Sequence, residues 1–322
     1  MAEVSTIVSL ESIRDAATLI EGVAVRTPLK ETPQLSRELG VRVLLKCENL
    51  QPVGAFKLRG AYTAIARLPE AVRARGVITY SSGNHGLAVT YAADLLGIKA
   101  VIVMPETAPR IKVEGVKKRG GEVVLAGTTS TQRKLKAEEI VAEQGYVMIP
   151  PFEHADVIAG QGTCGLEILE QLPEVATILV PVGGGGLLAG IATAIASLRP
   201  TVRVIGVEPA GAAKLAAALA ASHPVTLDKT GSIADGLLPL SIGTLPFAQM
   251  RDQVHESVQV SDDDIVKAMR YLHQDIHMRV EPSGAATTAA LIARVVPDLQ
   301  GPVVAVVSGG NVDADLFGRL VH

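Results

Sequence analysis

The sequence predicts an α/β protein with two open, twisted, mostly parallel sheets flanked by helices. Apolar runs of strand length alternate with longer segments of helical periodicity, and this alternation forms two blocks that are split near residue 150. The composition agrees, because 48% of the 322 residues are hydrophobic and only 3% are aromatic. A core of aliphatic side chains is typical of parallel strands that are buried on both faces.

The elements can be placed along the chain from periodicity and from the turn residues between them. The first block should hold strands at 41–48, 77–81, 100–104, 122–125 and 146–149, with helices at 8–20, 85–96, 111–118 and 131–144. The second should hold strands at 178–182, 202–207 and 303–307, with helices at 156–171, 187–197, 262–274 and 283–295. Residues 222–246 have no clear period and are expected to form loops.

Charge and cysteine usage exclude several classes of protein. The formal net charge of −3 provides no general attraction to nucleic acid. The two cysteines, Cys47 and Cys164, are far apart and lack metal-ligand spacing, which fits a reducing compartment. No apolar stretch reaches membrane-spanning length, and no basic, apolar leader is evident. A cytoplasmic protein without a membrane partner is therefore expected.

Lys57 lies in the segment Gly54-Ala-Phe-Lys-Leu-Arg-Gly60, just before a predicted helix. An ammonium group at a helix N-terminus meets the positive end of the helix dipole. Desolvation and this position both favour a neutral, nucleophilic amine. The alternative is a surface lysine that caps a turn.

Three loops follow predicted strands, where ligands bind in open α/β sheets. The loop Ser81-Ser82-Gly83-Asn84-His85-Gly86 offers hydroxyls and free N–H groups for a carboxylate or phosphate, although an ordinary capped turn is the alternative. Gly183, Gly184, Gly185 and Gly186 suit phosphate binding by backbone N–H groups, and they also match a loose dinucleotide fingerprint with Ala189 and Glu208. The third loop is Ser308-Gly309-Gly310-Asn311. Its serine hydroxyl could form a hydrogen bond with a nitrogen atom of a bound heterocycle.

These four motifs, in this order, resemble the fold-type II pyridoxal-phosphate enzymes of the serine/threonine dehydratase and serine racemase group, whose fold is like that of the tryptophan synthase β subunit. The resemblance covers nearly the whole chain. It implies a large domain of residues 1–69 and 157–322 and an inserted small domain of residues 70–156, which carries the serine loop. It extends to Val157-Ile-Ala-Gly-Gln-Gly-Thr163, Ile233-Ala-Asp-Gly236 and Val280-Glu-Pro-Ser-Gly284.

The resemblance assigns a role to each motif. Lys57 would hold pyridoxal 5'-phosphate as a Schiff base, and a neutral hydroxyl at the ring nitrogen would weaken the ring as an electron sink, which suits prompt loss of a β-leaving group. Lys57 would also remove the α-proton. The remaining cofactor-binding residues would be Phe56, Asn84, Gly183, Gly184, Gly185, Gly186, Leu187 and Ser308, and the substrate carboxylate would be bound by Ser81, Ser82 and His85.

The expected activity is a dehydratase, or ammonia-lyase, that acts on L-threonine or L-serine. A racemase of serine or aspartate is the nearest alternative, because the position of Ser82 supplies the second acid/base in the racemases. A β-replacement enzyme typically has threonine in place of His85. A nicotinamide-dependent dehydrogenase would leave Lys57 and Ser308 unexplained, and a cofactor-free binding protein would be expected to have lost Lys57. The group commonly forms homodimers, so a homodimer is expected.

Several residues depart from the family's pattern. The racemase-like members bind a divalent cation through a Glu and an Asp; here Glu208 is present, but Lys214 replaces the expected aspartate, and a lysine cannot ligate a hard cation. We therefore expect no metal site, with the ammonium group in the cation's place. Phe152-Glu153-His154 stands where members commonly have a polar residue or Phe-Asp. Arg133, on the helix 131–144, is a further candidate for the substrate carboxylate.

Overall fold

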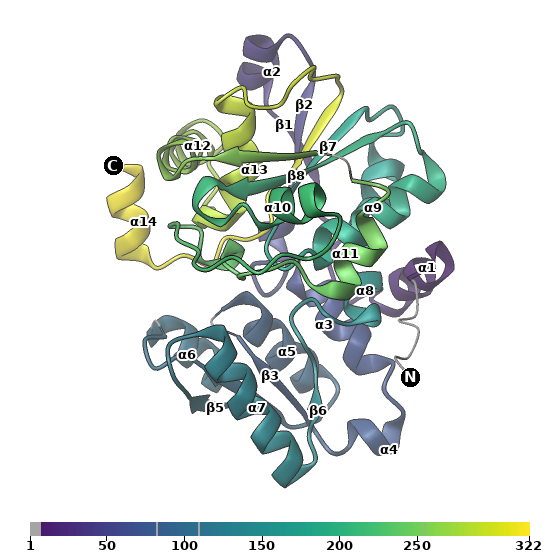
Figure 1. Ribbon diagram of the computed structural model, residues 1–322, viewed down its shortest axis with the longest axis vertical. Helices are drawn as coiled ribbons and strands as arrows, with labels where there is room; N and C mark the ends of the chain where they lie inside the picture. Colours follow the sequence, from purple (N-terminus) through teal and green to yellow (C-terminus); the bar gives the residue numbers. More distant parts are fainter. Residues whose placement is uncertain (1–7, 82, 109, 255) are drawn as a thin grey trace.

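The computed structural model describes residues 8–81, 83–108, 110–254 and 256–322, and its strands form two separate sheets (Figure 1). The large sheet has the order β1-β2-β10-β7-β8-β9, in which only the β1–β2 pair is antiparallel. The small sheet has the order β5-β4-β3-β6 and is parallel throughout. The predicted α/β fold with two mostly parallel sheets is confirmed.

The strands of the large sheet are buried on both faces at its centre, as their aliphatic sequences predict. Along β10, Val304 and Val306 face one core cluster, whereas Val303 and Ala305 face another. The strands of this sheet are β1 (Leu29–Glu31), β2 (Val43–Lys46), β7 (Thr177–Pro181), β8 (Arg203–Pro209), β9 (Glu256–Val260) and β10 (Val303–Val306).

Helices cover both faces of the large sheet, so each face of its strands packs against apolar side chains. One face carries α1 (Leu10–Leu19), α8 (Ala155–Gln171), α9 (Gly186–Leu198), α10 (Lys214–Ala221) and α11 (Thr244–Met250). The other carries α2 (Pro33–Leu39), α12 (Asp262–Gln274), α13 (Pro282–Ile292) and α14 (Ala314–Val321). The 3-10 turns are η1 (Glu48–Leu50), η2 (Ala210–Ala212) and η3 (Asp235–Leu237).

The small sheet consists of β3 (Val77–Tyr80), β4 (Ala100–Met104), β5 (Glu122–Leu125) and β6 (Val147–Met148). Its strands all lie within the segment expected to form the small domain, although the boundaries of that domain stay a prediction. One face packs on α3 (Lys57–Ala66), α5 (Asn84–Leu95) and α6 (Arg110–Lys118), and the other on α7 (Ser130–Gln144). The short helix α4 (Glu70–Arg73) precedes β3.

Helix α3 lies between the two sheets and packs closely against α8 (Figure 1). The contact is close because glycines face each other: a Cβ atom on Gly160 would lie 2.4 Å from the carbonyl oxygen of Arg59 and 2.6 Å from the Cα of Gly60. Any larger residue would push the helices apart. This contact fixes α3, and with it Lys57, relative to the large sheet.

The described part of the chain contains no helix with both the length and the hydrophobicity required to cross a membrane.

Candidate active site

Lys57 is held next to the loop that follows β10. The backbone N–H of Phe56 donates to the carbonyl oxygen of Ser308 at 3.1 Å, and Ala55 forms an antiparallel bridge with Gly309. These contacts place the start of α3 at the carboxyl edge of the large sheet, where ligands are expected in this class of fold. Two motifs that lie some 250 residues apart in the sequence are thus neighbours.

The amine of Lys57 is partly buried and is not paired with any carboxylate among the described residues. Its Nζ donates to the carbonyl oxygen of Pro151 at 2.8 Å and lies 5.0 Å from the centre of the Phe56 ring. Desolvation lowers the pKa of Lys57 to about 8. An amine with such a pKa is partly neutral near physiological pH, so it can act as a nucleophile or as a base.

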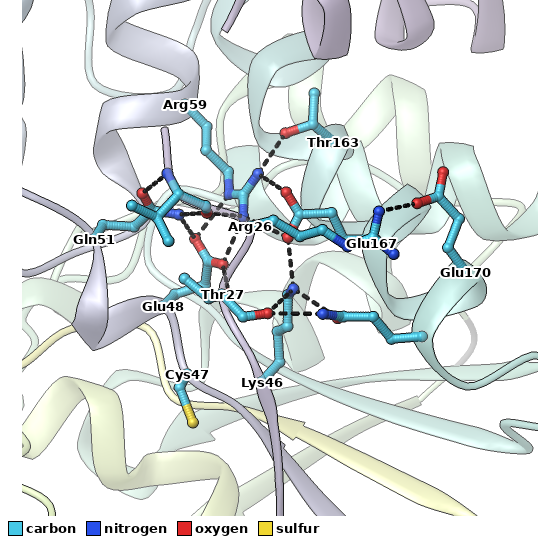
Figure 2. Close-up of polar contacts among 12 residues, drawn as sticks. Arg26, Thr27, Lys46, Cys47, Glu48, Gln51, Arg59, Thr163, Glu167 and Glu170 are labelled. Atoms are coloured by element: carbon cyan, nitrogen blue, oxygen red, sulfur yellow. Dashed lines mark hydrogen bonds and ion pairs between the residues drawn. The ribbon is translucent and has the colours of Figure 1, made fainter. Parts of the chain in front are cut away.

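A buried ionic cluster anchors the first turn of α3 through Arg59, two residues after Lys57 in the sequence (Figure 2). All five N–H groups of Arg59 are used: they reach both carboxylate oxygens of Glu48 at 2.8 Å, both of Glu167 at 2.7 and 2.8 Å, and the hydroxyl of Thr163 at 3.0 Å. Lys46 donates to Glu167 as well, at 2.5 Å. The charges of two cations, Arg59 and Lys46, and two carboxylates, Glu48 and Glu167, therefore cancel within this cluster. Arg59 thereby fixes the position of α3.

Among the described residues, the side-chain amide of Asn84 has one N–H group left without a partner, and the hydrogen bonds of the rest of the amide fix its direction. Its Nδ2 donates to Glu281 at 2.6 Å, and its Oδ1 accepts from Nδ2 of Asn311 at 2.8 Å. Asn311 also donates to the carbonyl of Val53 at 2.7 Å, which identifies its Nδ2 and so fixes the amide orientation of Asn84. The remaining N–H of Asn84 is a donor suited to a ring hydroxyl group.

Sequence reasoning gave no role to Glu281, although the structure places it beside Asn84. Its carboxyl group is buried, and burial together with the charge of Asp235 raises the pKa of Glu281 to about 8. In the sequence this glutamate precedes Pro282 at the start of a helix, which is also the pattern of an ordinary helix start. Only the structure shows that the carboxyl group belongs to the site.

The tetraglycine loop, residues 183–186, connects β7 to α9 and fits a phosphate group. Among the described residues, the N–H groups of residues 183–187 donate to no backbone or side-chain acceptor. Free N–H groups at a helix N-terminus form an anion site. A Cβ atom on Gly184 would lie 2.2 Å from the ring of Phe152, so the close approach of this ring requires glycine.

Residues 151–152 contact both Lys57 and the tetraglycine loop. The carbonyl oxygen of Pro151 accepts the hydrogen bond from Lys57, and the ring of the next residue, Phe152, covers Gly184. Lys57 and the tetraglycine loop therefore lie on the two sides of one short segment. A ligand with a phosphate group and a carbonyl carbon, such as pyridoxal phosphate, fits these donors.

The serine loop has one residue, Ser82, that lies outside the described residues. The hydroxyl of Ser81 accepts from the N–H of Gly83 at 3.2 Å and can still donate. His85 is buried, its Nε2 pairs with the carbonyl of Ile149 at 3.0 Å, and burial together with the charge of Lys57 lowers the pKa of His85 to about 3. A neutral ring whose N–H is engaged cannot bind a carboxylate strongly, so the loop's hydroxyl and backbone N–H groups are better suited to this role.

Two further sequence expectations concern charged residues. Glu208 is buried and paired with Lys214 at 3.1 Å, so it cannot reach the ribose that the nicotinamide alternative requires. Arg133 is buried on α7 with its Nη1 on the carbonyl of Thr128 at 3.2 Å, and no described carboxylate pairs with it. Burial lowers the pKa of Arg133.

Comparisons with known proteins agree with this geometry. The family model described as "Pyridoxal-phosphate dependent enzyme" matches residues 20–309. An "L-threonine ammonia-lyase" from Geobacter sulfurreducens is 44% identical over 297 residues, which are 92% of this chain and 74% of the relative. The solved structure of maize serine racemase is 38% identical with a TM-score of 0.92, over 98% of this chain and 97% of that one. The solved structure of a serine racemase from Dictyostelium discoideum is 35% identical with a TM-score of 0.89, over 95% and 99%.

Proposed function

The chain belongs to the family of pyridoxal-phosphate-dependent enzymes, and from this premise we propose that it is an ammonia-lyase that converts L-threonine, L-serine or both to a 2-oxo acid and ammonia. The observation that carries the proposal is Lys57: an amine with a pKa of about 8 on a helix that the Arg59 cluster anchors, hydrogen-bonded to the residue before the ring that covers Gly184. A structural surface lysine would need neither the anchoring nor the neighbouring free N–H groups.

The proposed cofactor-binding residues follow from their donors and acceptors. Lys57 would hold pyridoxal phosphate covalently, residues 183–187 would bind its phosphate through their free N–H groups, and Asn84 would donate to its ring hydroxyl group. Ser308, whose hydroxyl makes no hydrogen bond within the described residues, would face the ring nitrogen, and Phe56 would pack beside the ring. When bound, the cofactor supplies an electron sink for negative charge at the substrate Cα.

The residues of the chain would then bind the substrate and move its protons. Ser81, with the backbone of the serine loop and with Ser82 as a further candidate, would bind the substrate carboxylate. The substrate amine would take the place of Lys57 on the cofactor, and the released amine of Lys57, which is neutral in a large fraction of molecules near pH 8, would remove the proton from the substrate Cα. The β-hydroxyl group would leave, and the overall products would be the oxo acid and ammonia.

A serine racemase is the second candidate, because a racemase structure is similar over almost the whole chain and because Ser82 is present in the sequence. Ser82 would act as the acid/base on the face opposite to Lys57. Ser82→Ala should abolish racemisation and largely spare dehydration of the L-substrate.

The experiment that tests the function is incubation of the purified protein with L-threonine, L-serine and D-serine, with the visible spectrum, the oxo acid and the chirality recorded. We expect a visible cofactor band and oxo acid from at least one L-isomer. A band with inverted chirality but without oxo acid would favour the racemase. If no band forms after addition of pyridoxal phosphate, both proposals are wrong.

Assembly, location and cation use belong to the same proposal. We expect a homodimer, which sedimentation equilibrium can establish, and a cytoplasmic location. The ammonium group of Lys214 lies beside Glu208, where a divalent cation would otherwise be expected. We therefore expect turnover that requires no divalent cation.

A further inference from the structure

Lys214 is a fully buried lysine directly behind the tetraglycine loop. Its Nζ donates to three oxygens: the carbonyl of Val182 at 2.9 Å, the carbonyl of Ala212 at 3.0 Å and Oε1 of Glu208 at 3.1 Å. An ammonium group has three N–H donors, so all of them are used. Val182 immediately precedes Gly183, and the contact therefore reaches the peptide from which the loop starts.

Glu208 is a rigid partner for this ammonium group. Its Oε1 also accepts from the backbone N–H of Leu215 at 2.8 Å, and its Oε2 accepts from the N–H of Ala216 at 3.1 Å and from the hydroxyl of Ser257 at 2.9 Å. The carboxylate is thus fixed by the start of α10 and by β9. Through Lys214, these two elements determine where the carbonyl of Val182 points.

The direction of this carbonyl matters for the loop, because the peptide plane that carries it also carries the N–H of Gly183. A carbonyl held from behind by an ammonium group turns that N–H in a set direction. Loss of the ammonium group would leave Glu208 as a buried charge without its cation and the carbonyl without its donor. The loop would then be free to rotate at its first peptide.

We propose that Lys214 is a positioning residue for the tetraglycine loop: it acts as a cation tethered to the chain that orients the N–H groups for a phosphate. The inference rests on the proposed binding of a phosphorylated cofactor by this loop. It predicts that Lys214 contributes to recognition of the phosphate itself, and not merely to folding of the large domain.

The chain offers a matched control in Lys46, which is also fully buried and also donates to three oxygens (Figure 2). Its acceptors are Glu167, Gln171 and the carbonyl of Thr27, none of which lies in the tetraglycine loop. Removal of Lys214 leaves the buried carboxylate of Glu208 without its cation, whereas removal of Lys46 leaves Glu167 with Arg59 as its only cation among the described residues, so both changes should cost stability. Only removal of Lys214 should alter the loop.

The test measures the dissociation constants of pyridoxal phosphate and of pyridoxal, which lacks the phosphate, for the apo forms of the wild type, Lys214→Ala and Lys46→Ala. We expect the preference for the phosphorylated compound to fall by about tenfold or more in Lys214→Ala, which corresponds to about 1.4 kcal/mol, and to stay at the wild-type value in Lys46→Ala. An unchanged preference in Lys214→Ala, or an equal fall in both variants, would overturn the proposal.

If Lys214→Ala does not fold, the double variant Lys214→Met with Glu208→Gln removes both charges and leaves no buried ion uncompensated. It should fold and still show the reduced preference; a wild-type preference would contradict the inference. In any folded Lys214→Ala, ammonium chloride should restore the preference, because the ion can re-enter among the three oxygens, whereas tetramethylammonium chloride should not. If ammonium does not restore the preference for pyridoxal phosphate, the positive charge of Lys214 is not what positions the loop.

The same experiment separates the inference from the proposed function. If the wild type shows no preference for pyridoxal phosphate over pyridoxal, the loop does not bind phosphate and the proposed function fails. If the wild type shows the preference and Lys214→Ala retains it, the function stands and only the role of Lys214 is wrong.

Discussion

Replacement of Glu48 by glutamine should destabilise the protein strongly, because it breaks the buried cluster that anchors α3 (Figure 2). The carboxylate of Glu48 accepts two hydrogen bonds from Arg59, both at 2.8 Å, and both side chains are fully buried. Burial raises the pKa of Glu48, but the attraction of Arg59 outweighs this and leaves the pKa below its ordinary value. Glu48 is therefore charged at neutral pH.

The magnitude follows from these contacts. Two charge-assisted hydrogen bonds of about 1.5–3 kcal/mol each give a loss of about 3–6 kcal/mol, and removal of one partner of a buried ion pair typically costs about 3–5 kcal/mol. Glu48→Gln also leaves two cations against one carboxylate, Glu167. We expect a loss of about 3–5 kcal/mol in the free energy of unfolding.

The assay is urea-induced unfolding of the apo protein at neutral pH, followed by circular dichroism. Glu31→Gln is the control, because the Arg42–Glu31 pair is 48% and 57% exposed and should contribute only about 0–1 kcal/mol. The difference between Glu48→Gln and the wild type should shrink as the pH falls below about 4.5, since the stabilisation from a carboxylate with a lowered pKa is lost in acid. A loss no larger than that of the control would refute this reasoning.

Three further predictions test other parts of the site. Gly184→Ala should weaken binding of pyridoxal phosphate by about 1–3 kcal/mol, because its Cβ would lie 2.2 Å from the Phe152 ring; the added change Phe152→Ala should recover part of the loss, and no recovery would show that the ring is not the obstacle. Because the pKa of Glu281 is raised to about 8, the folded chain holds a proton that the unfolded chain releases above about pH 4.5, so stability should fall as the pH rises between these values. Glu281→Gln should flatten this fall in urea titrations, and an unchanged slope would contradict the assignment. Chelation of divalent cations should leave turnover unchanged, since Lys214 already pairs with Glu208; loss of turnover that magnesium restores would count against this.

The sequence predicted much of the fold because strands with aliphatic runs and helices with clear periodicity leave strong local signals. The strand at 100–104 and the helix at 262–274 have the predicted bounds. Other elements were missed. β9, with the sequence Glu-Ser-Val-Gln-Val, is a half-buried edge strand with few apolar residues, and α10 and α11 lie in or near a stretch without clear period. Such elements are stabilised by tertiary packing rather than by local preference.

Site residues that belong to a short sequence motif could be predicted. Site residues that are brought together only by the fold could not. Lys57 and the tetraglycine loop are recognisable as short patterns. The raised pKa of Glu281 depends on burial and on the charge of Asp235, and the contact of Phe152 with Gly184 depends on the path of a loop from the small sheet. No local pattern records either. The sequence also proposed His85 as a carboxylate-binding residue, whereas its ring is buried and engaged by Ile149.

The central claim is that the amine of Lys57 carries the cofactor. It is tested most directly by reduction of the protein with borohydride in the presence of pyridoxal phosphate, followed by peptide mass spectrometry. We expect the phosphopyridoxyl mass on Lys57 in stoichiometric amount, and we expect Lys57→Ala to carry none and to produce no oxo acid. Stoichiometric label on another lysine, with Lys57 unmodified, would show that Lys57 does not carry the cofactor.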